Sequence, residues 1–348
     1  MNNRGVKFFL PKGTINDATE YYCNLLEKSF EERNYTVDRV DSVKFLRKED
    51  IVITIRPADQ IKIGKGYKGK INWFQGIGSE EYVLLHGKNI RSFIISRYLE
   101  YVEKKSLVNS DLCIFVSQRM KKYYEDKYKL NLENKSVIIP CYNQHLNKEF
   151  FYTQNRYEKL NFIYAGGLFA WQCIDRTLLI FREIYNMDNS ATLTLLTGDK
   201  ENAYRLIKKY GLNNVIVDYC KLDELQEKLA EYKYAFLIRE DNIVNNVSTP
   251  TKMNSYLASG LIPIYTDVID DFEKNIKIDS FSVKLSADLS DNQMADEIMM
   301  HHKSKNINAE TLYKSYTETF IKYYNDNMYI EVLKNKLQDF EVLKSIEN

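Results

Sequence analysis

Short apolar runs alternate with segments of helical period along the chain, and this alternation occurs twice. In the first half the apolar runs are continuous, which is typical of parallel strands covered on both faces. They cover residues 6–10, 36–40, 51–55, 71–74, 112–116 and 137–139, and helical periods cover residues 18–33, 89–107 and 118–128. In the segment 89–107 we expect an inward apolar stripe of Ile94, Ile95, Leu99, Val102 and Leu107.

The pattern restarts after residues 140–160, a segment without a period that we interpret as a linker. Strands are predicted at 162–165, 193–196, 215–217, 235–238, 262–265 and 281–285, and helices at 174–185, 201–210, 222–232, 250–259 and 293–302. This alternation predicts an α/β protein of two Rossmann-like, doubly wound parallel-sheet domains, residues 1–157 and 158–308. Residues 309–348 are predicted as C-terminal helices that pack across the domains and back onto the first.

Composition narrows the class of protein. The 348 residues include 17 Phe and 27 Tyr but only 13 Gly and 5 Pro, which excludes a disordered or collagen-like chain. No apolar stretch reaches the roughly 18 residues of a membrane span, and the stretch that ends at Pro11 is too short for a signal peptide. The five cysteines form no C-x-x-C pair and the four histidines show no ligand spacing. We therefore expect reduced thiols, a cytoplasmic location and no metal site.

The net charge of +1 hides an asymmetry between the halves. Residues 1–157 contain 27 Lys and Arg against 19 Asp and Glu, whereas residues 158–348 contain 22 against 29. Such a difference indicates either that the halves face different partners or that the charge compositions of two solvated surfaces have diverged by drift. The basic residues neither form one run nor interleave regularly with aromatic residues, so no nucleic-acid partner is expected.

Ligands of doubly wound sheets bind at the carboxyl ends of strands, in the turns that lead to helices. The turn after residues 6–10 carries Gly13 and Thr14 but lacks the G-x-G-x-x-G pattern of dinucleotide sites. In this turn Asn16 or Asp17 suits the N-cap position of the next helix, and a ligand-binding role of the turn stays equally open.

The turn after residues 71–74 carries Gln75 and Gly76, followed by Ser79 as an expected N-cap and by Glu80 and Glu81. Paired carboxylates suit acid/base catalysis. Acidic residues in a first helical turn are also ordinary partners of the helix dipole, and we favour this interpretation.

In the second half, two glycines follow the strand 162–165. Gly166 and Gly167 let the backbone approach a ligand closely, and Trp171 in the same loop suits either stacking on a substrate or filling a domain interface. Asp199, in the next such turn, is explained by an N-cap role.

The turn after residues 235–238 places two cations near one helix start. Arg239 ends the buried strand, Thr249 and Pro250 are expected at the N-cap and first helical positions, and Thr251 and Lys252 follow. A helix N-terminus binds anions through its amides and dipole, but the same dipole disfavours cations. A doubly negative ligand explains why Arg239 and Lys252 flank this end.

The segments YAGGLFAWQ (164–172) and STPTKMNSYLASGLIP (248–263) resemble the donor-binding domain of the retaining family 4 of GT-B glycosyltransferases, especially bacterial capsule and cell-surface polysaccharide enzymes. The resemblance implies that the second half binds a UDP- or GDP-sugar, that the first half binds the acceptor, and that neither a metal nor a cofactor is required. Three positions depart from the family pattern. Gly167 stands in place of an Arg, Gln172 near the place of a Lys, and Ser255 in place of a ribose-binding Glu.

With those charges missing, we assign the diphosphate to Arg239 and Lys252, which would stabilise the leaving group as catalytic residues. The donor-binding candidates are Gly166, Gly167, Trp171, Gln172, Thr249, Thr251, Asn254 and Ser255. The acceptor-side candidates are Gly13, Thr14, Gln75, Gly76 and Glu80.

The resulting hypothesis is a retaining glycosyltransferase that moves a sugar to a lipid-linked or cell-surface oligosaccharide at the cytoplasmic face of the inner membrane. Basic surfaces are attracted to anionic lipids, and the predicted docking face carries Arg91, Arg97, Lys104, Lys105, Arg119, Lys121 and Lys122. Two alternatives stay open. One is a non-catalytic GT-B homologue that binds glycan or supports a partner enzyme, and the other is a GT-B sugar-nucleotide epimerase.

Overall fold

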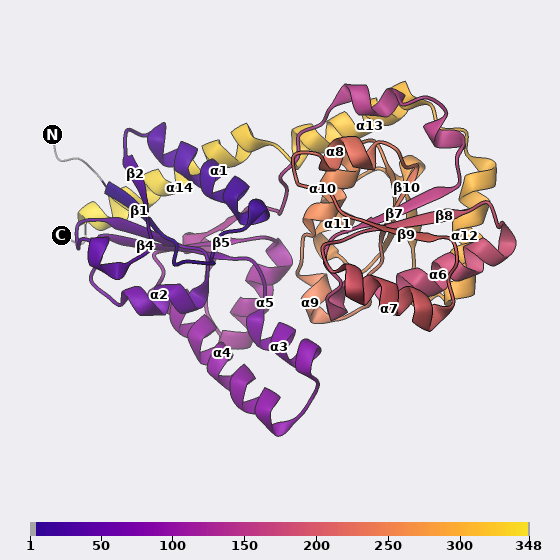
Figure 1. Cartoon of the computed structure of the whole chain (residues 1–348). Helices are drawn as coiled ribbons and strands as arrows, with labels where there is room; N and C mark the ends of the chain where they lie inside the picture. Colours follow the sequence, from indigo (N-terminus) through magenta and orange to yellow (C-terminus); the bar gives the residue numbers. More distant parts are fainter. Residues whose placement is uncertain (1–4, 347–348) are drawn as a thin grey trace. The chain divides into compact units, whose positions relative to one another are not determined.

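The structure, a computed structural model, describes residues 5–346 and consists of two compact units (Figure 1). The first unit comprises Met1–Cys141, Val247–Thr249 and Asn325–Asn348, and the second comprises Tyr142–Asn246 and Pro250–Tyr324.

The chain enters the second unit at Tyr142, earlier than the expected boundary at residue 157. The fully buried Arg156 accounts for part of this difference. Its guanidinium donates to the backbone carbonyls of Phe150, Tyr232 and Ser259 at 2.6, 2.7 and 2.8 Å, all within the second unit. The segment before residue 157 is therefore attached to the second unit by hydrogen bonds that its lack of periodicity did not reveal.

Within the described chain, the first unit contains a six-stranded parallel sheet ordered β2-β1-β3-β4-β5-β6. Its strands are β1 (Gly5–Phe9), β2 (Thr36–Val40), β3 (Ile51–Thr54), β4 (Gly69–Phe74), β5 (Leu112–Phe115) and β6 (Ser136–Ile138). Its helices are α1 (Asp17–Glu31), α2 (Pro57–Ile63), α3 (Gly78–His86), α4 (Ile90–Asn109), α5 (Gln118–Tyr128) and α14 (Asp326–Ile346). Helices α1 and α14 pack together on one face of this sheet, and α2 and α4 pack together on the other (Figure 1).

The second unit repeats this plan with a six-stranded parallel sheet, again counted over residues 5–346, ordered β12-β11-β10-β7-β8-β9. Its strands are β7 (Asn161–Ala165), β8 (Thr192–Leu196), β9 (Val215–Asp218), β10 (Tyr234–Leu237), β11 (Ile262–Thr266) and β12 (Val283–Leu285). Its helices are α6 (Ile174–Met187), α7 (Lys200–Tyr210), α8 (Leu225–Leu229), α9 (Ile243–Asn246), α10 (Thr251–Ala258), α11 (Asp270–Asn275), α12 (Asp291–Ser304) and α13 (Ala309–Lys322).

The predicted fold class is confirmed: both sheets are entirely parallel and have helices around them. The central strands β3, β5 and β10 are buried along their whole length, as their continuous apolar runs predicted. Each helix of the C-terminal tail belongs to a different unit, α13 to the second and α14 to the first. The short helices α2 and α11 are absent from the sequence prediction because six or seven residues are too few to establish a period.

Some of the predicted helix N-caps are confirmed and others are wrong. The Asn16 side chain accepts a hydrogen bond from the Thr19 amide (3.0 Å), and Asp199 accepts one from the Asn202 amide (3.3 Å), so both cap their helices as expected. The prediction for Ser79 is wrong, because α3 already begins at Gly78.

Each sheet has one switch point, where the chain changes the direction in which it adds strands. In the first sheet it lies between β1 and β3, and in the second between β7 and β10. The helices that follow the two strands at a switch point lie on opposite faces of the sheet, which leaves room at the carboxyl edge between them for a ligand.

Candidate functional site

The switch point of the second sheet brings together Gln172, from the loop after β7, and Arg239, which follows β10 by two residues. The Arg239 Nη2 atom donates to the Gln172 side-chain oxygen Oε1 (2.6 Å), and Nη1 donates to the Gln172 backbone oxygen (3.1 Å). The Arg239 backbone is fixed in turn by Thr266 on β11, whose hydroxyl accepts from the Arg239 amide (2.9 Å) and donates to its carbonyl (2.7 Å). The guanidinium is therefore held rigidly, and Arg239 is only 1% exposed.

Lys252 reaches the same point from the first turn of α10. Its ammonium donates to the Tyr164 hydroxyl (2.9 Å) and to Gln172 Oε1, and lies 4.2 Å from the centre of the Tyr164 ring. One amide oxygen, that of Gln172, thus accepts hydrogen bonds from both cations. The predicted convergence of Arg239 and Lys252 is present within the second unit.

Within the part of the chain that the structure describes, no carboxylate neutralises this pair. Among the ion pairs formed by the described residues, none includes Arg239 or Lys252. Burial, and after it the nearby Arg239 charge, holds the pKa of Lys252 well below its usual range. Burial likewise lowers the pKa of Arg239. Two partly or fully buried cations without a counter-ion are costly unless an anion joins them, so this arrangement suits a phosphate or diphosphate group.

The glycines of the loop after β7 are required by close packing. Gly166 has a φ of +130°, and a Cβ atom there would lie 2.5 Å from Lys252 Cε. A Cβ at Gly167 would lie 2.9 Å from the Phe169 ring, which stacks on Trp171 with ring centres 5.0 Å apart. Phe169 is 55% exposed, so the loop presents an aromatic surface beside the cation pair.

Three further donor-side candidates make hydrogen bonds within the protein. Thr249 does not cap α10, whose N-cap is Pro250; its hydroxyl accepts from the Cys141 amide (3.0 Å) and donates to the Val116 carbonyl (3.3 Å). The fully buried Asn254 binds the backbone of the segment before β7, where its Oδ1 accepts from the amides of residues 143 and 144. The Ser255 hydroxyl donates to the Thr251 carbonyl one turn earlier (3.3 Å).

The first sheet has a polar cluster at its own switch point. Thr14, after β1, accepts a hydrogen bond from Nη2 of Arg56, after β3 (2.7 Å), and Arg56 Nε donates to the buried Asp59 (2.6 Å). The preceding Gly13 adopts a φ of +78°, and Gln75, after β4, donates to the Ile55 carbonyl (2.9 Å). Sequence reasoning missed Arg56, although an Arg directly after a buried strand was the signal used for Arg239.

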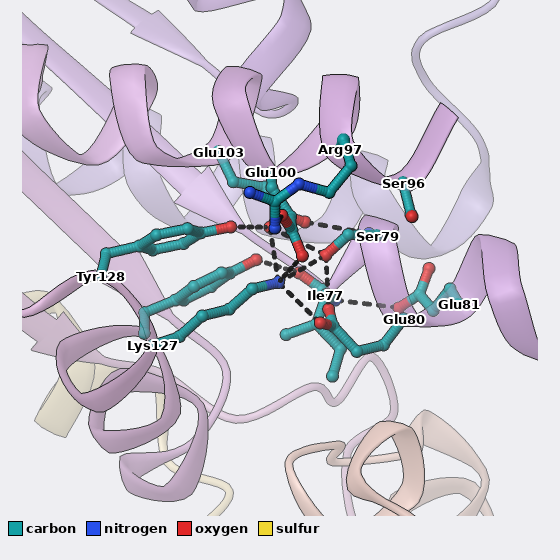
Figure 2. Close-up of polar contacts among 12 residues, drawn as sticks. Ile77, Ser79, Glu80, Glu81, Ser96, Arg97, Glu100, Glu103, Lys127 and Tyr128 are labelled. Atoms are coloured by element: carbon teal, nitrogen blue, oxygen red, sulfur yellow. Dashed lines mark hydrogen bonds and ion pairs between the residues drawn. The ribbon is translucent and has the colours of Figure 1, made fainter. Parts of the chain in front are cut away.

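Glu80 and Glu81 are engaged in the packing of α3 (Figure 2). Glu80 binds the ammonium of Lys127 on α5 (2.6 Å), and Glu81 accepts from the Ile77 amide (3.0 Å), folding back so closely that a Cβ at Gly76 would meet its carboxylate at 2.0 Å. These contacts agree with a role at the start of the helix.

Glu103 on α4 completes this network. It is 3% exposed, accepts from the Ser79 amide (3.1 Å) and the Tyr128 hydroxyl (2.6 Å), and burial raises the pKa of its carboxyl group (Figure 2).

Helix α4 is polar on its inner face and apolar on its outer face. Its buried residues include Ser92, Ser96, Glu103 and Ser106. Outward, Ile90, Phe93, Ile94, Tyr98 and Tyr101 are exposed by 81%, 66%, 62%, 64% and 57%. The expected inward stripe is therefore wrong for Ile94, whereas Val102 and Leu107 are buried as predicted.

Comparisons with known proteins identify the fold. No family profile matches the chain, and neither does any curated protein sequence. Solved structures do match. Sucrose-phosphate synthase from Thermosynechococcus elongatus has a TM-score of 0.69 at 12% identity, over 98% of this chain and 100% of that one. Anabaena HepE, solved with UDP and glucose, has a TM-score of 0.67 at 10% identity, over 96% and 99%.

S. aureus TarM, a variant of which is solved with UDP and alpha-GlcNAc-glycerol, has a TM-score of 0.62 at 14% identity. The match covers 85% of this chain but only 57% of TarM. WaaG, described as a glycosyltransferase of lipopolysaccharide biosynthesis, has a TM-score of 0.63 at 10% identity over 94% and 99%. The chain therefore has the GT-B fold, as these glycosyltransferases do.

Proposed function

We propose that this protein is a retaining glycosyltransferase that uses a UDP- or GDP-sugar as its donor. The observation that carries the proposal is the uncompensated pair of Arg239 and Lys252 at the switch point of the second sheet. The GT-B fold supports it, and two structural neighbours hold UDP. The retention of configuration rests on the family resemblance.

In the reaction, negative charge grows on the diphosphate as the glycosidic bond breaks. Arg239 and Lys252 would bind this leaving group, and their fixed positions mean that little reorganisation is needed as the charge develops. The first amides of α10, at Thr251 and Lys252, add the positive end of the helix dipole. In this proposal these groups supply the charge that the donor needs, without a metal or a further cofactor.

The first test is a thermal-shift screen of the protein against UDP, GDP, CMP and their sugars, followed by calorimetry with the nucleotide that binds. We expect Arg239→Ala and Lys252→Ala to weaken binding and to lower kcat by about 100-fold or more. Lys208→Ala removes an equal charge from the exposed face of α7 and serves as the matched control. Absence of nucleotide binding would contradict the donor assignment and favour a non-catalytic glycan-binding homologue, whereas an epimerised donor without acceptor would show an epimerase.

We further propose that the acceptor is lipid-linked or part of a cell-surface oligosaccharide and that the first unit docks on an anionic membrane through α4. The exposed apolar residues of this helix are accompanied by Arg91, Arg97, Lys104 and Lys105. No helix among the described residues is long and apolar enough to cross a membrane. An anionic bilayer offers apolar contact and opposite charge together, whereas pairing this face with a second copy would bring like charges together.

The docking face is smaller than the sequence suggested. Lys121 is 4% exposed and binds Glu133, and Lys122 forms an ion pair with Asp126 (2.9 Å). The first unit, with α14 included, contains 28 Lys and Arg against 23 Asp and Glu, a smaller excess than residues 1–157 carry. The docking proposal therefore rests on α4 rather than on the net charge of the unit.

Flotation with phosphatidylglycerol vesicles and with neutral phosphatidylcholine vesicles tests the docking. We expect binding to the anionic vesicles, its loss in the double variant Phe93→Ser with Ile94→Ser, and no change in Ile321→Ser, which alters an equally exposed residue on α13. Equal binding to both kinds of vesicle, or retention by the double variant, would contradict it.

A further inference from the structure

Gln172 occupies the one position that both cations of the candidate diphosphate site share. Its Oε1 accepts from Arg239 Nη2 (2.6 Å) and from Lys252 Nζ. Its backbone oxygen separately accepts from Arg239 Nη1 (3.1 Å). An amide oxygen carries only a partial negative charge, so it satisfies these donors without neutralising them.

We propose that the Gln172 side chain is a built-in competitor of the diphosphate, an oxygen that holds the cation pair in place when the site is empty and leaves when an anion arrives. This inference rests on the proposed function only in taking the anion to be a nucleoside diphosphate. A phosphate oxygen bound by both cations has to take the position of Oε1, because that position is where the two donors converge. The anion displaces Oε1 because the hydrogen bonds of the two cations to an ionised phosphate oxygen are stronger than those to a neutral amide oxygen.

The exchange requires rotation of the side chain only. The loop backbone stays attached because the Gln172 amide donates to the Phe169 carbonyl (2.8 Å) and the Tyr164 hydroxyl donates to the Gly167 carbonyl. Arg239 keeps its bond to the Gln172 backbone oxygen while Oε1 departs. Lys252 keeps the Tyr164 hydroxyl as a second partner. Both cations thus remain aimed at the same point throughout.

The role assigned to Gln172 implies a trade-off that a ligand-binding residue would not show. Removing its carbonyl takes the acceptor from the buried Arg239 Nη2 atom and one of two acceptors from Lys252, which lowers the stability of the empty protein. The same change removes the competitor and so raises the affinity for the anion. Replacing the amide by a carboxylate has the reverse effect on both quantities, because Glu at this position forms ion pairs with both cations and closes the site.

The test compares Gln172→Met, which keeps the length of the side chain but lacks the acceptor, with Gln172→Glu. Titration calorimetry of wild type, both variants and Arg239→Ala is carried out with UDP, GDP and inorganic pyrophosphate, and the melting temperature is recorded for each without ligand. We expect Gln172→Met to bind about tenfold more tightly while melting at a lower temperature. We expect Gln172→Glu to bind at least tenfold more weakly while melting at a higher temperature.

Weaker binding by Gln172→Met, by a factor similar to that of Arg239→Ala, would show that Gln172 is a ligand contact and would overturn the inference with the donor site intact. If pyrophosphate follows the expected order but neither nucleotide binds better than pyrophosphate, the inference stands and the proposed donor is wrong. If wild type and Gln172→Met bind none of the three probes, both are overturned.

Discussion

The side chain of Lys252 lies directly against Gly166, in the space that a Cβ atom would fill. A Cβ built on Gly166 would be 2.5 Å from Lys252 Cε and 3.0 Å from Nζ. The turn after β7 therefore determines where the ammonium of Lys252 lies, and the glycine at this place is needed for both its backbone conformation and its small size.

Gly166→Ala should displace Lys252 and abolish nucleotide binding. The substitution also introduces a side chain at a φ of +130°, so we expect the free energy of unfolding to fall by about 1 to 3 kcal/mol. Gly198→Ala, in the corresponding turn after β8, is the control, because its nearest neighbour would be Tyr219 at 3.8 Å. Calorimetry and urea unfolding measure the two effects; a Gly166→Ala variant with normal affinity would contradict the described position of Lys252.

Nucleotide binding should be accompanied by proton uptake at Lys252. Burial and Arg239 lower the pKa of this group in the empty site, and a bound diphosphate favours its charged form. Affinity should therefore fall as the pH rises from the pKa of the empty site towards the higher pKa of the bound state, and the proton is taken up within this window. Calorimetry over a range of pH, each time in two buffers of different ionisation enthalpy, separates proton uptake from binding heat. The Lys252→Met variant should show no such uptake, and equal apparent heats in the two buffers for wild type would be the contrary result.

Lys127→Met should destabilise the first unit strongly. The Lys127 ammonium lies 2.6 Å from Glu80 and 3.7 Å from Glu103, whose side chain is 4% exposed, so its loss leaves one buried and one partly buried carboxylate without their cation (Figure 2). We expect the free energy of unfolding to fall by about 3 kcal/mol. The neighbouring Lys122→Met removes an exposed ion pair with Asp126 from the same helix and should leave it unchanged within error. Similar losses in both variants would refute a special role for this network.

Lys233→Met should stabilise the protein at neutral pH. Lys233 is 1% exposed, its ammonium contacts His302 Nδ1 (3.1 Å), and burial lowers its pKa to about 8. Because the unfolded chain binds more protons between pH 8 and about 10.5, wild-type stability should rise with pH in this window. At pH values below this window, the substitution should raise the free energy of unfolding by about 2 kcal/mol. Urea unfolding at pH 7 and pH 10 checks this, and an equal effect at the two values would exclude the titration of Lys233 as the cause.

The sequence by itself determined the fold class, because covered parallel strands require continuous apolar runs and every predicted strand lies within one or two residues of an observed one. It also placed Arg239 and Lys252 together, since Arg239 ends the strand and Lys252 begins the helix of one strand-to-helix connection. Contacts between segments far apart in the chain were decided only by the tertiary structure. Gln172 is 67 residues from Arg239, and no local pattern shows that its amide oxygen stands between the two cations.

The tertiary structure also decided which face of helix α4 is buried. Its apolar residues have a helical period whether they face a core or solvent, and periodicity alone cannot tell the two faces apart when both carry apolar and polar residues. Glu103 settles the orientation, because its hydrogen bonds with Ser79 and Tyr128 supply buried partners for a carboxylate. Those partners come from α3 and α5, and only the packing of three helices brings them together. The polar face of α4 is therefore buried, and Ile90, Phe93 and Ile94 are left on the surface.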